Sequence, residues 1–123
     1  MNANFIFEAL EESKKSTHRV RIGAVIYNKG SLISRGYNQP FRSVKSVHPF
    51  ARRWKTSLHA EVSAILNAKR DLKGCSITVV RLNRASEIKI GKPCSHCLDY
   101  IDYVGIKRVF FSDNDGKIKE FKL

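Results

Sequence analysis

Two short stretches, far apart in the sequence, constrain what this chain can fold into. The first is His59-Ala60-Glu61, and the second is Pro93-Cys94-Ser95-His96-Cys97. Imidazole and thiolate groups are common zinc ligands in proteins, so His59, Cys94 and Cys97 are candidate metal ligands. Three protein ligands leave a fourth coordination position open, which is typical of a catalytic zinc site. We therefore expect a fold that brings these three side chains together.

Each stretch is expected to lie at the start of a helix. Residues 58–68 carry apolar side chains at helical spacing, and Ser57 precedes them as the expected N-cap. Pro93 is expected to introduce a helix over 94–103, which Gly105 terminates. Both metal-ligand stretches would then occupy helix N-termini, where the backbone dipole favours negative charge.

Within the second helix the two cysteines are three residues apart, so their sulfurs should face the same side. His96 lies between them and should point away, and we do not count it as a ligand. Glu61 follows His59 by two residues and is the candidate for proton transfer beside the metal.

The rest of the chain predicts an α/β domain with a mixed five-stranded sheet. A helix is expected over 4–16, where apolar residues recur at helical spacing. Apolar runs bounded by turn residues predict strands over 20–27, 31–37, 75–82, 107–112 and 117–121. Only the turn 113–116 separates the last two strands, so we expect an antiparallel hairpin, because a parallel pair needs a crossover of about a dozen residues.

On the His59-Ala60-Glu61 and Pro93-Cys94-x-x-Cys97 motifs, the chain resembles the cytidine/deoxycytidylate deaminase superfamily of zinc-dependent nucleobase deaminases. The resemblance covers about residues 17–112. It implies a three-layer fold with the two motif helices on one face of the sheet. It also implies that Glu61 shuttles protons during hydrolytic conversion of cytosine to uracil, and that backbone groups near Ala60 and Pro93-Cys94 orient the base.

A further segment indicates which kind of substrate to expect. Gly36-Tyr37-Asn38-Gln39-Pro40 resembles the Gly-x-Asn-x-Pro segment of deoxycytidylate and tRNA adenosine deaminases, where the asparagine bonds the substrate sugar. Asn38 is the matching residue. A histidine at the position of His59 is also similar to that branch, because nucleoside-type cytidine deaminases commonly have cysteine at this ligand position. The terminal hairpin, in contrast, resembles the nucleoside-type branch. The resemblance therefore implies a nucleoside or nucleotide of (deoxy)cytidine or dCMP type.

The charge distribution favours a second kind of substrate. The formal net charge is +12, and every charged residue between Glu12 and Glu61 is Lys or Arg. A basic segment over 14–55 would attract single-stranded nucleic acid, so cytosine or adenine deamination in tRNA or single-stranded DNA is the alternative function. The aromatic and basic connection 39–57 suits an oligomer interface nearly as well, so a homo-oligomer is also expected.

Two interpretations that assign the motif to other classes of function remain open. Cys94-Ser95-His96-Cys97 has the spacing of a thioredoxin-like redox pair. The same residues would also suit a non-enzymatic, zinc-stabilised module that binds nucleic acid. Only the enzymatic interpretation requires Glu61.

Length and cysteine content set the remaining expectations. We expect a single domain over 1–123, because 123 residues are enough for one hydrophobic core. Three cysteines, two of them in the metal motif, indicate reduced thiols and a cytoplasmic protein. The sequence has no signal-peptide pattern and no apolar run near the ~20 residues of a membrane span, so no membrane partner is expected.

Overall fold

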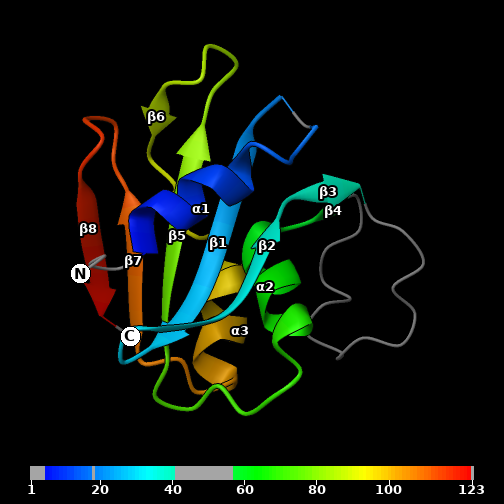
Figure 1. Ribbon diagram of the computed structural model, residues 1–123, viewed down its shortest axis with the longest axis vertical. Coiled ribbons are helices and arrows are strands. Elements are labelled where there is room, and N and C mark those ends of the chain that lie inside the picture. The colour runs from blue at the N-terminus through cyan, green and yellow to red at the C-terminus, as the bar shows by residue number, and fades with distance from the viewer. Residues whose placement is uncertain (1–4, 18, 41–56, 123) are drawn as a thin grey trace.

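The computed structural model describes residues 5–17, 19–40 and 57–122, and the predicted basic connection over 41–56 lies outside them. The chain forms three helices and a mixed sheet within this part (Figure 1). In chain order the elements are α1 (Ile6–Ser13), β1 (Arg21–Asn28), β2 (Ser31–Tyr37), β3 (Gln39–Pro40), β4 (Ser57–Leu58), α2 (Ala60–Ala68), β5 (Ser76–Leu82), β6 (Ile88–Lys89), α3 (Ser95–Tyr103), β7 (Arg108–Ser112) and β8 (Ile118–Lys122).

The main sheet has the strand order β2-β1-β5-β7-β8, with β6 paired to β5. β5 and β7 are parallel, whereas the β1–β2, β1–β5 and β7–β8 pairs are antiparallel. The mixed sheet and the terminal hairpin are therefore confirmed. The five predicted strands form the path of the main sheet, and this sheet has a sixth strand because the polar segment after β5 folds back as β6. There Asn83 Oδ1 accepts hydrogen bonds from the backbone N–H groups of Ala85 and Glu87, and a turn results. β3 and β4 form a separate two-stranded sheet.

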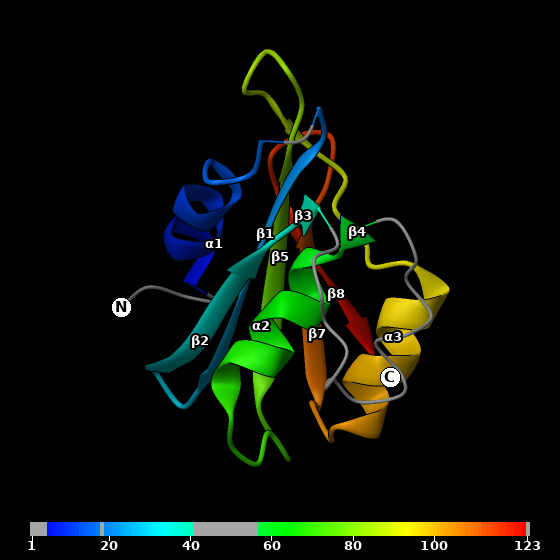
Figure 2. The same ribbon diagram turned by 90° about the vertical axis from the view of Figure 1, so that its right-hand side faces the viewer.

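The three layers are visible edge-on in Figure 2, where α1 lies on one side of the sheet and α2 and α3 lie together on the other. Alternate strand residues supply the two cores, since successive side chains point to opposite faces. On the α1 side, Val25, Val80 and Phe110 are buried. On the α2 and α3 side the buried strand residues include Ala24, Ile26, Ile77, Val79, Val109 and Phe111. The predicted placement of both motif helices on one face is confirmed.

Two glycines allow the helices to approach the sheet closely. A side-chain carbon on Gly23 would overlap the backbone of Ala9 and Ser13 in α1. A side-chain carbon on Gly36 would likewise overlap the backbone of α2 at Ala64. Ser34 Oγ also donates a 2.7 Å hydrogen bond to the Ala64 carbonyl, so α2 is tied directly to β2.

The helix boundaries differ from the prediction in ways that affect the site. α1 is shorter than the predicted 4–16. α2 begins at Ala60 with His59 as its N-cap, so the prediction that Ser57 caps the helix was wrong. The reason is that Ser57 and Leu58 pair as strand β4 with Pro40 and Gln39. Strand pairing therefore holds the backbone extended up to His59.

Candidate active site

His59, Cys94 and Cys97 meet at one point of the fold. His59 Nδ1 lies 3.3 Å from Cys97 Sγ and 3.8 Å from Cys94 Sγ. The three donor atoms all lie within 4.8 Å of one another, and among residues 5–17, 19–40 and 57–122 no other such group is found. Tetrahedral coordination at zinc bond lengths of about 2.0–2.3 Å separates neighbouring donors by about 3.5–3.8 Å. The donor spacing therefore fits one shared divalent ion.

The topology explains this convergence. α2 precedes β5 and α3 precedes β7, and the two strands are parallel neighbours, so both helices begin at the carboxyl end of the strands. His59 is the N-cap of α2, and Cys94 is the N-cap of α3. Figure 2 shows the two helices on the same side of the sheet. The positive ends of two helix dipoles thus lie where the thiolates are, and they stabilise negative charge.

The thiols and the imidazole form an ionised cluster. The pKa of Cys94 is lowered to about 3, first by a hydrogen bond from the Cys97 thiol and then by hydrogen bonds from His59 and the Cys97 N–H. The same contact with the Cys94 thiolate, together with burial, raises the pKa of Cys97. The hydrogen bond to Cys94 raises the pKa of His59. This charge distribution suits a cation, because a bound metal replaces the protons that the three donors share.

Glu61 is buried beside this cluster, with 4% of its surface exposed. Its Oε1 atom has no hydrogen-bond partner among the described residues. Burial is the main reason that the pKa of Glu61 is raised to about 7. Buried polar atoms without partners are rare and usually have a functional reason. A carboxyl group with a pKa near neutral is suited to take up and release protons at physiological pH. The Oε1 atom without a partner is also consistent with a metal ion bound by the three neighbouring donors.

Asn38 is engaged with the backbone of the neighbouring strand. Its Oδ1 accepts a 2.8 Å hydrogen bond from the Ile22 N–H, and its Nδ2 donates a 2.7 Å bond to the Val20 carbonyl. The next residue, Gln39, reaches Ser63 Oγ in the first turn of α2 at 3.3 Å. Asn38 therefore ties the end of β2 to the start of β1, beside the strand pair that leads into His59.

The other predicted site residues lie where their helices begin. Ala60 is fully buried as the first residue of α2. His96 is exposed on α3 and lies outside the three-donor group. The structure thus brings together His59, Glu61, Cys94 and Cys97. Asn38 follows β2 and bonds to Val20 and Ile22 instead.

Sequence reasoning missed Ser112, which holds the segment leading to Cys94. Its Oγ donates to the Lys89 carbonyl at 2.7 Å and accepts from the Arg81 N–H at 3.2 Å, while its carbonyl accepts from the Gly91 N–H at 2.8 Å. Ser112 is 1% exposed. Nothing in the sequence separates it from an ordinary serine at a strand end, because its partners come from another part of the chain.

Residues 2–113 match the model of a family described as the cytidine and deoxycytidylate deaminase zinc-binding region. The chain belongs to this deaminase family. The match covers most of the chain, including both motifs, and the sequence-based identification of the family is confirmed.

Individual relatives agree with this assignment. The chain is 37% identical over 93 residues to a protein of Aliivibrio fischeri described as an uncharacterized deaminase in the luxG 3′ region. That match covers 73% of this chain and 56% of the relative, so the chain spans little more than half of that protein.

Two solved structures show the same fold. The cytidine deaminase of Burkholderia pseudomallei superposes with a TM-score of 0.69 at 17% identity, over 99% of this chain and 92% of that one. The apo dCMP deaminase of cyanophage S-TIM5 gives a TM-score of 0.60 at 19% identity, over 92% and 86% of the two chains. No helix in the described part of this chain is both long and apolar enough to cross a membrane.

Proposed function

We propose that this protein is a zinc-dependent hydrolase that deaminates cytosine to uracil in a nucleoside or nucleotide. The observation that carries the proposal is the convergence of His59, Cys94 and Cys97 beside the buried Glu61, whose Oε1 has no hydrogen-bond partner among the described residues. A redox dithiol would not require a buried carboxyl group beside it, and neither would a structural zinc module. Family membership supports the hydrolytic reaction class.

In this proposal His59 Nδ1 and the two cysteine sulfurs hold the ion. Zinc, when bound, lowers the pKa of water at its open position and so supplies a nucleophile at neutral pH. Glu61 accepts the proton of the attacking water and delivers it to the ring nitrogen beside the reacting carbon. Glu61 then takes the second proton of that water, which is now on the hydroxyl group of the reacting carbon, and passes it to the amine; the carbon–nitrogen bond breaks, ammonia leaves and the carbonyl of uracil forms. A pKa of about 7 lets the same carboxyl group act first as base and then as acid.

Asn38 and the backbone at Ala60 are the proposed substrate contacts. The backbone at Ala60 begins α2, next to the ligand His59 and the proton carrier Glu61. Asn38 keeps one lone pair on Oδ1 and one hydrogen on Nδ2 beyond its bonds to Val20 and Ile22, which is enough for a sugar hydroxyl. The β1 backbone would then hold the amide in place before substrate arrives.

The second candidate function is deamination within a polynucleotide. The net charge of +12 favours it, since a basic surface attracts polyanions. Its activity should fall steeply with rising salt and be confined to oligonucleotides. Turnover of free cytidine or dCMP that is insensitive to salt would reject it.

The test is to load the protein with zinc and follow ammonia release from cytidine, deoxycytidine, dCMP and short oligonucleotides containing cytosine. Glu61→Gln is the matched control, because it keeps the shape of the side chain and removes the proton acceptor. We expect turnover by the wild-type protein and near-complete loss in the variant. Zinc binding without turnover of any of these substrates would refute the proposal.

A further inference from the structure

A pair of basic side chains lies on the face of the sheet that carries the active site. Arg81 in β5 is directly opposite Lys89 in β6 and opposite Ile22 in β1. Residues opposite each other in antiparallel strands point to the same face. Ile22 packs against the core under α2 and α3, as does Val79, two residues before Arg81. Arg81 and Lys89 therefore extend from that same face.

Their position along the strand places them at the level of the helix N-termini. Arg81 lies two residues beyond Val79, which is about 7 Å further toward the carboxyl end of β5. α2 and α3 begin at this same end of the sheet, with His59 and Cys94 as their N-caps. In open α/β sheets, ligands bind beyond the carboxyl ends of the strands.

The end of β2 and the segment before Cys94 both bond to this pair or to its immediate neighbours. On one side Ile22, the cross-strand neighbour of Arg81, bonds to Asn38. On the other side, the Arg81 backbone and Lys89 are joined through Ser112 Oγ, just before the segment that leads to Cys94.

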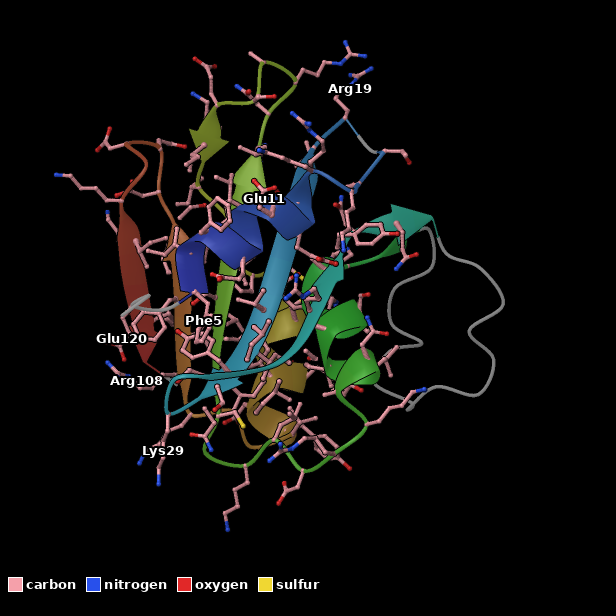
Figure 3. All side chains as sticks on the ribbon, in the orientation of Figure 1. Phe5, Glu11, Arg19, Lys29, Arg108 and Glu120 are labelled. Atoms are coloured by element: carbon pink, nitrogen blue, oxygen red, sulfur yellow. The ribbon has the colours of Figure 1, made fainter. Side chains whose placement is uncertain are left out.

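The pair is electrostatically unbalanced. Like charges directly opposite in a sheet are destabilising, and within the described ranges neither Arg81 nor Lys89 forms an ion pair. By contrast, Arg108 near the other end of β7 holds Glu120 through two bonds of 2.9 and 3.0 Å (Figure 3).

The Arg81 guanidinium is also incompletely bonded. Its Nε is buried with no hydrogen-bond partner in the described part of the chain. One terminal nitrogen reaches the Ile90 carbonyl at 3.5 Å, which is longer than a well-formed hydrogen bond. Because few of the five N–H donors of Arg81 are hydrogen-bonded to the described part of the protein, donors remain for a ligand.

We propose that Arg81 and Lys89 bind the phosphate of a pyrimidine mononucleotide, so that the substrate of this deaminase is the nucleotide and not the nucleoside. This inference rests on the proposed function. The base would enter at the helix N-termini, and the phosphate would lie over the β5–β6 pair at the rim. Arg81 supplies a planar fork of donors and Lys89 a second positive charge. Both favour a phosphate over a neutral hydroxyl group.

The test compares dCMP with deoxycytidine at low, fixed ionic strength, because salt screens exposed charges. The ratio of kcat/KM for dCMP to kcat/KM for deoxycytidine should fall about 10- to 100-fold in Arg81→Gln, as expected for a lost charged hydrogen bond. It should fall less in Lys89→Gln. Lys107→Gln is the control, since this exposed lysine lies at the other end of the sheet, just before β7.

Several results would overturn the proposal. One is a ratio in Arg81→Gln within about twofold of the wild-type ratio. Another is a loss confined to an oligonucleotide with internal cytosine, which would assign the basic pair to a polynucleotide. A structural role predicts that Lys89→Gln lowers the free energy of unfolding, whereas relief of like-charge repulsion leaves it equal or higher.

Calorimetry separates this proposal from the proposed function. If the zinc-loaded protein turns over neither substrate, the proposed function fails. The subsite is then decided by binding alone. Tighter binding of dCMP than of deoxycytidine, lost in Arg81→Gln, would support it. Equal binding of the two would refute it.

Discussion

His59 Nδ1 and Cys97 Sγ lie 3.3 Å apart, although the two residues belong to different helices and are 38 positions apart in the chain. The contact exists because α2 and α3 start at the same end of two parallel strands. Cys97 is fully buried among core residues, whereas Cys94 is exposed. The proposed ligand set thus spans the boundary between core and solvent.

Substitution of Cys94 should remove zinc without unfolding the protein. Because Cys94 is exposed, Cys94→Ala deletes a ligand and leaves the core intact. We expect zinc affinity to fall roughly a hundredfold or more, since only two of the three protein donors remain. Metal content after dialysis against a weak chelator measures this. Cys97→Ala is the comparison, because it should lower both zinc affinity and the stability of the metal-free chain. Full zinc retention by Cys94→Ala would contradict the ligand assignment.

Glu61 should carry most of the catalytic proton transfer. We expect Glu61→Gln to bind zinc normally and to lower kcat about a hundred- to ten-thousandfold, the usual range for a lost general acid–base group. Steady-state ammonia release, together with zinc content, measures both effects. A variant that keeps more than about a tenth of wild-type kcat would show that another group moves the proton.

The raised pKa of Glu61 predicts a pH-dependent stability for the metal-free protein. Because the pKa in the folded chain is about 7, above its ordinary 4.5, the folded state holds the proton more tightly than the unfolded state. The stability from protonated Glu61 is therefore present at low pH and lost as pH rises from 4.5 to 7. Glu61→Gln should exceed the wild type by about 3 kcal/mol at pH 8 and match it near pH 4. Urea unfolding with chelator present measures the difference.

Ser112→Ala should weaken the metal site from a distance. The change removes the Oγ bonds to Lys89 and Arg81 that hold the segment before Cys94. We expect about a tenfold loss of zinc affinity, typical for groups that support metal ligands, and about 1–3 kcal/mol of stability. Competition with a zinc-binding dye measures the first effect. Exposed Ser31, replaced by alanine, is the control and should change neither.

Gly36→Ala should destabilise the fold by displacing α2. The added carbon would overlap backbone atoms of Ala64, and these cannot move aside as the end of a flexible side chain could. We expect a loss of about 1–3 kcal/mol or more in the free energy of unfolding. Thermal unfolding measures it. An unchanged melting temperature would mean that α2 does not rest on β2 as described.

Much of this protein could be predicted from local patterns. The spacing of Cys94 and Cys97 on a helix, the apolar runs of β1, β2, β5, β7 and β8, and the turn at 113–116 depend on near neighbours in the chain. Such patterns can be recognised without knowledge of the tertiary structure, because they depend only on residue spacing along the chain. The family, the mixed sheet and the antiparallel terminal hairpin followed from them.

Tertiary structure decided what depends on distant partners. Strand pairing of Ser57 with Pro40 made His59 the cap of α2, and burial of the first turn of α2 raised the pKa of Glu61. The bonds of Ser112 and the cross-strand position of Arg81 arise only once β5, β6 and β7 lie side by side. A sequence determines which groups are available, but burial and hydrogen-bond partners are properties of the folded chain, and these give the groups their chemistry.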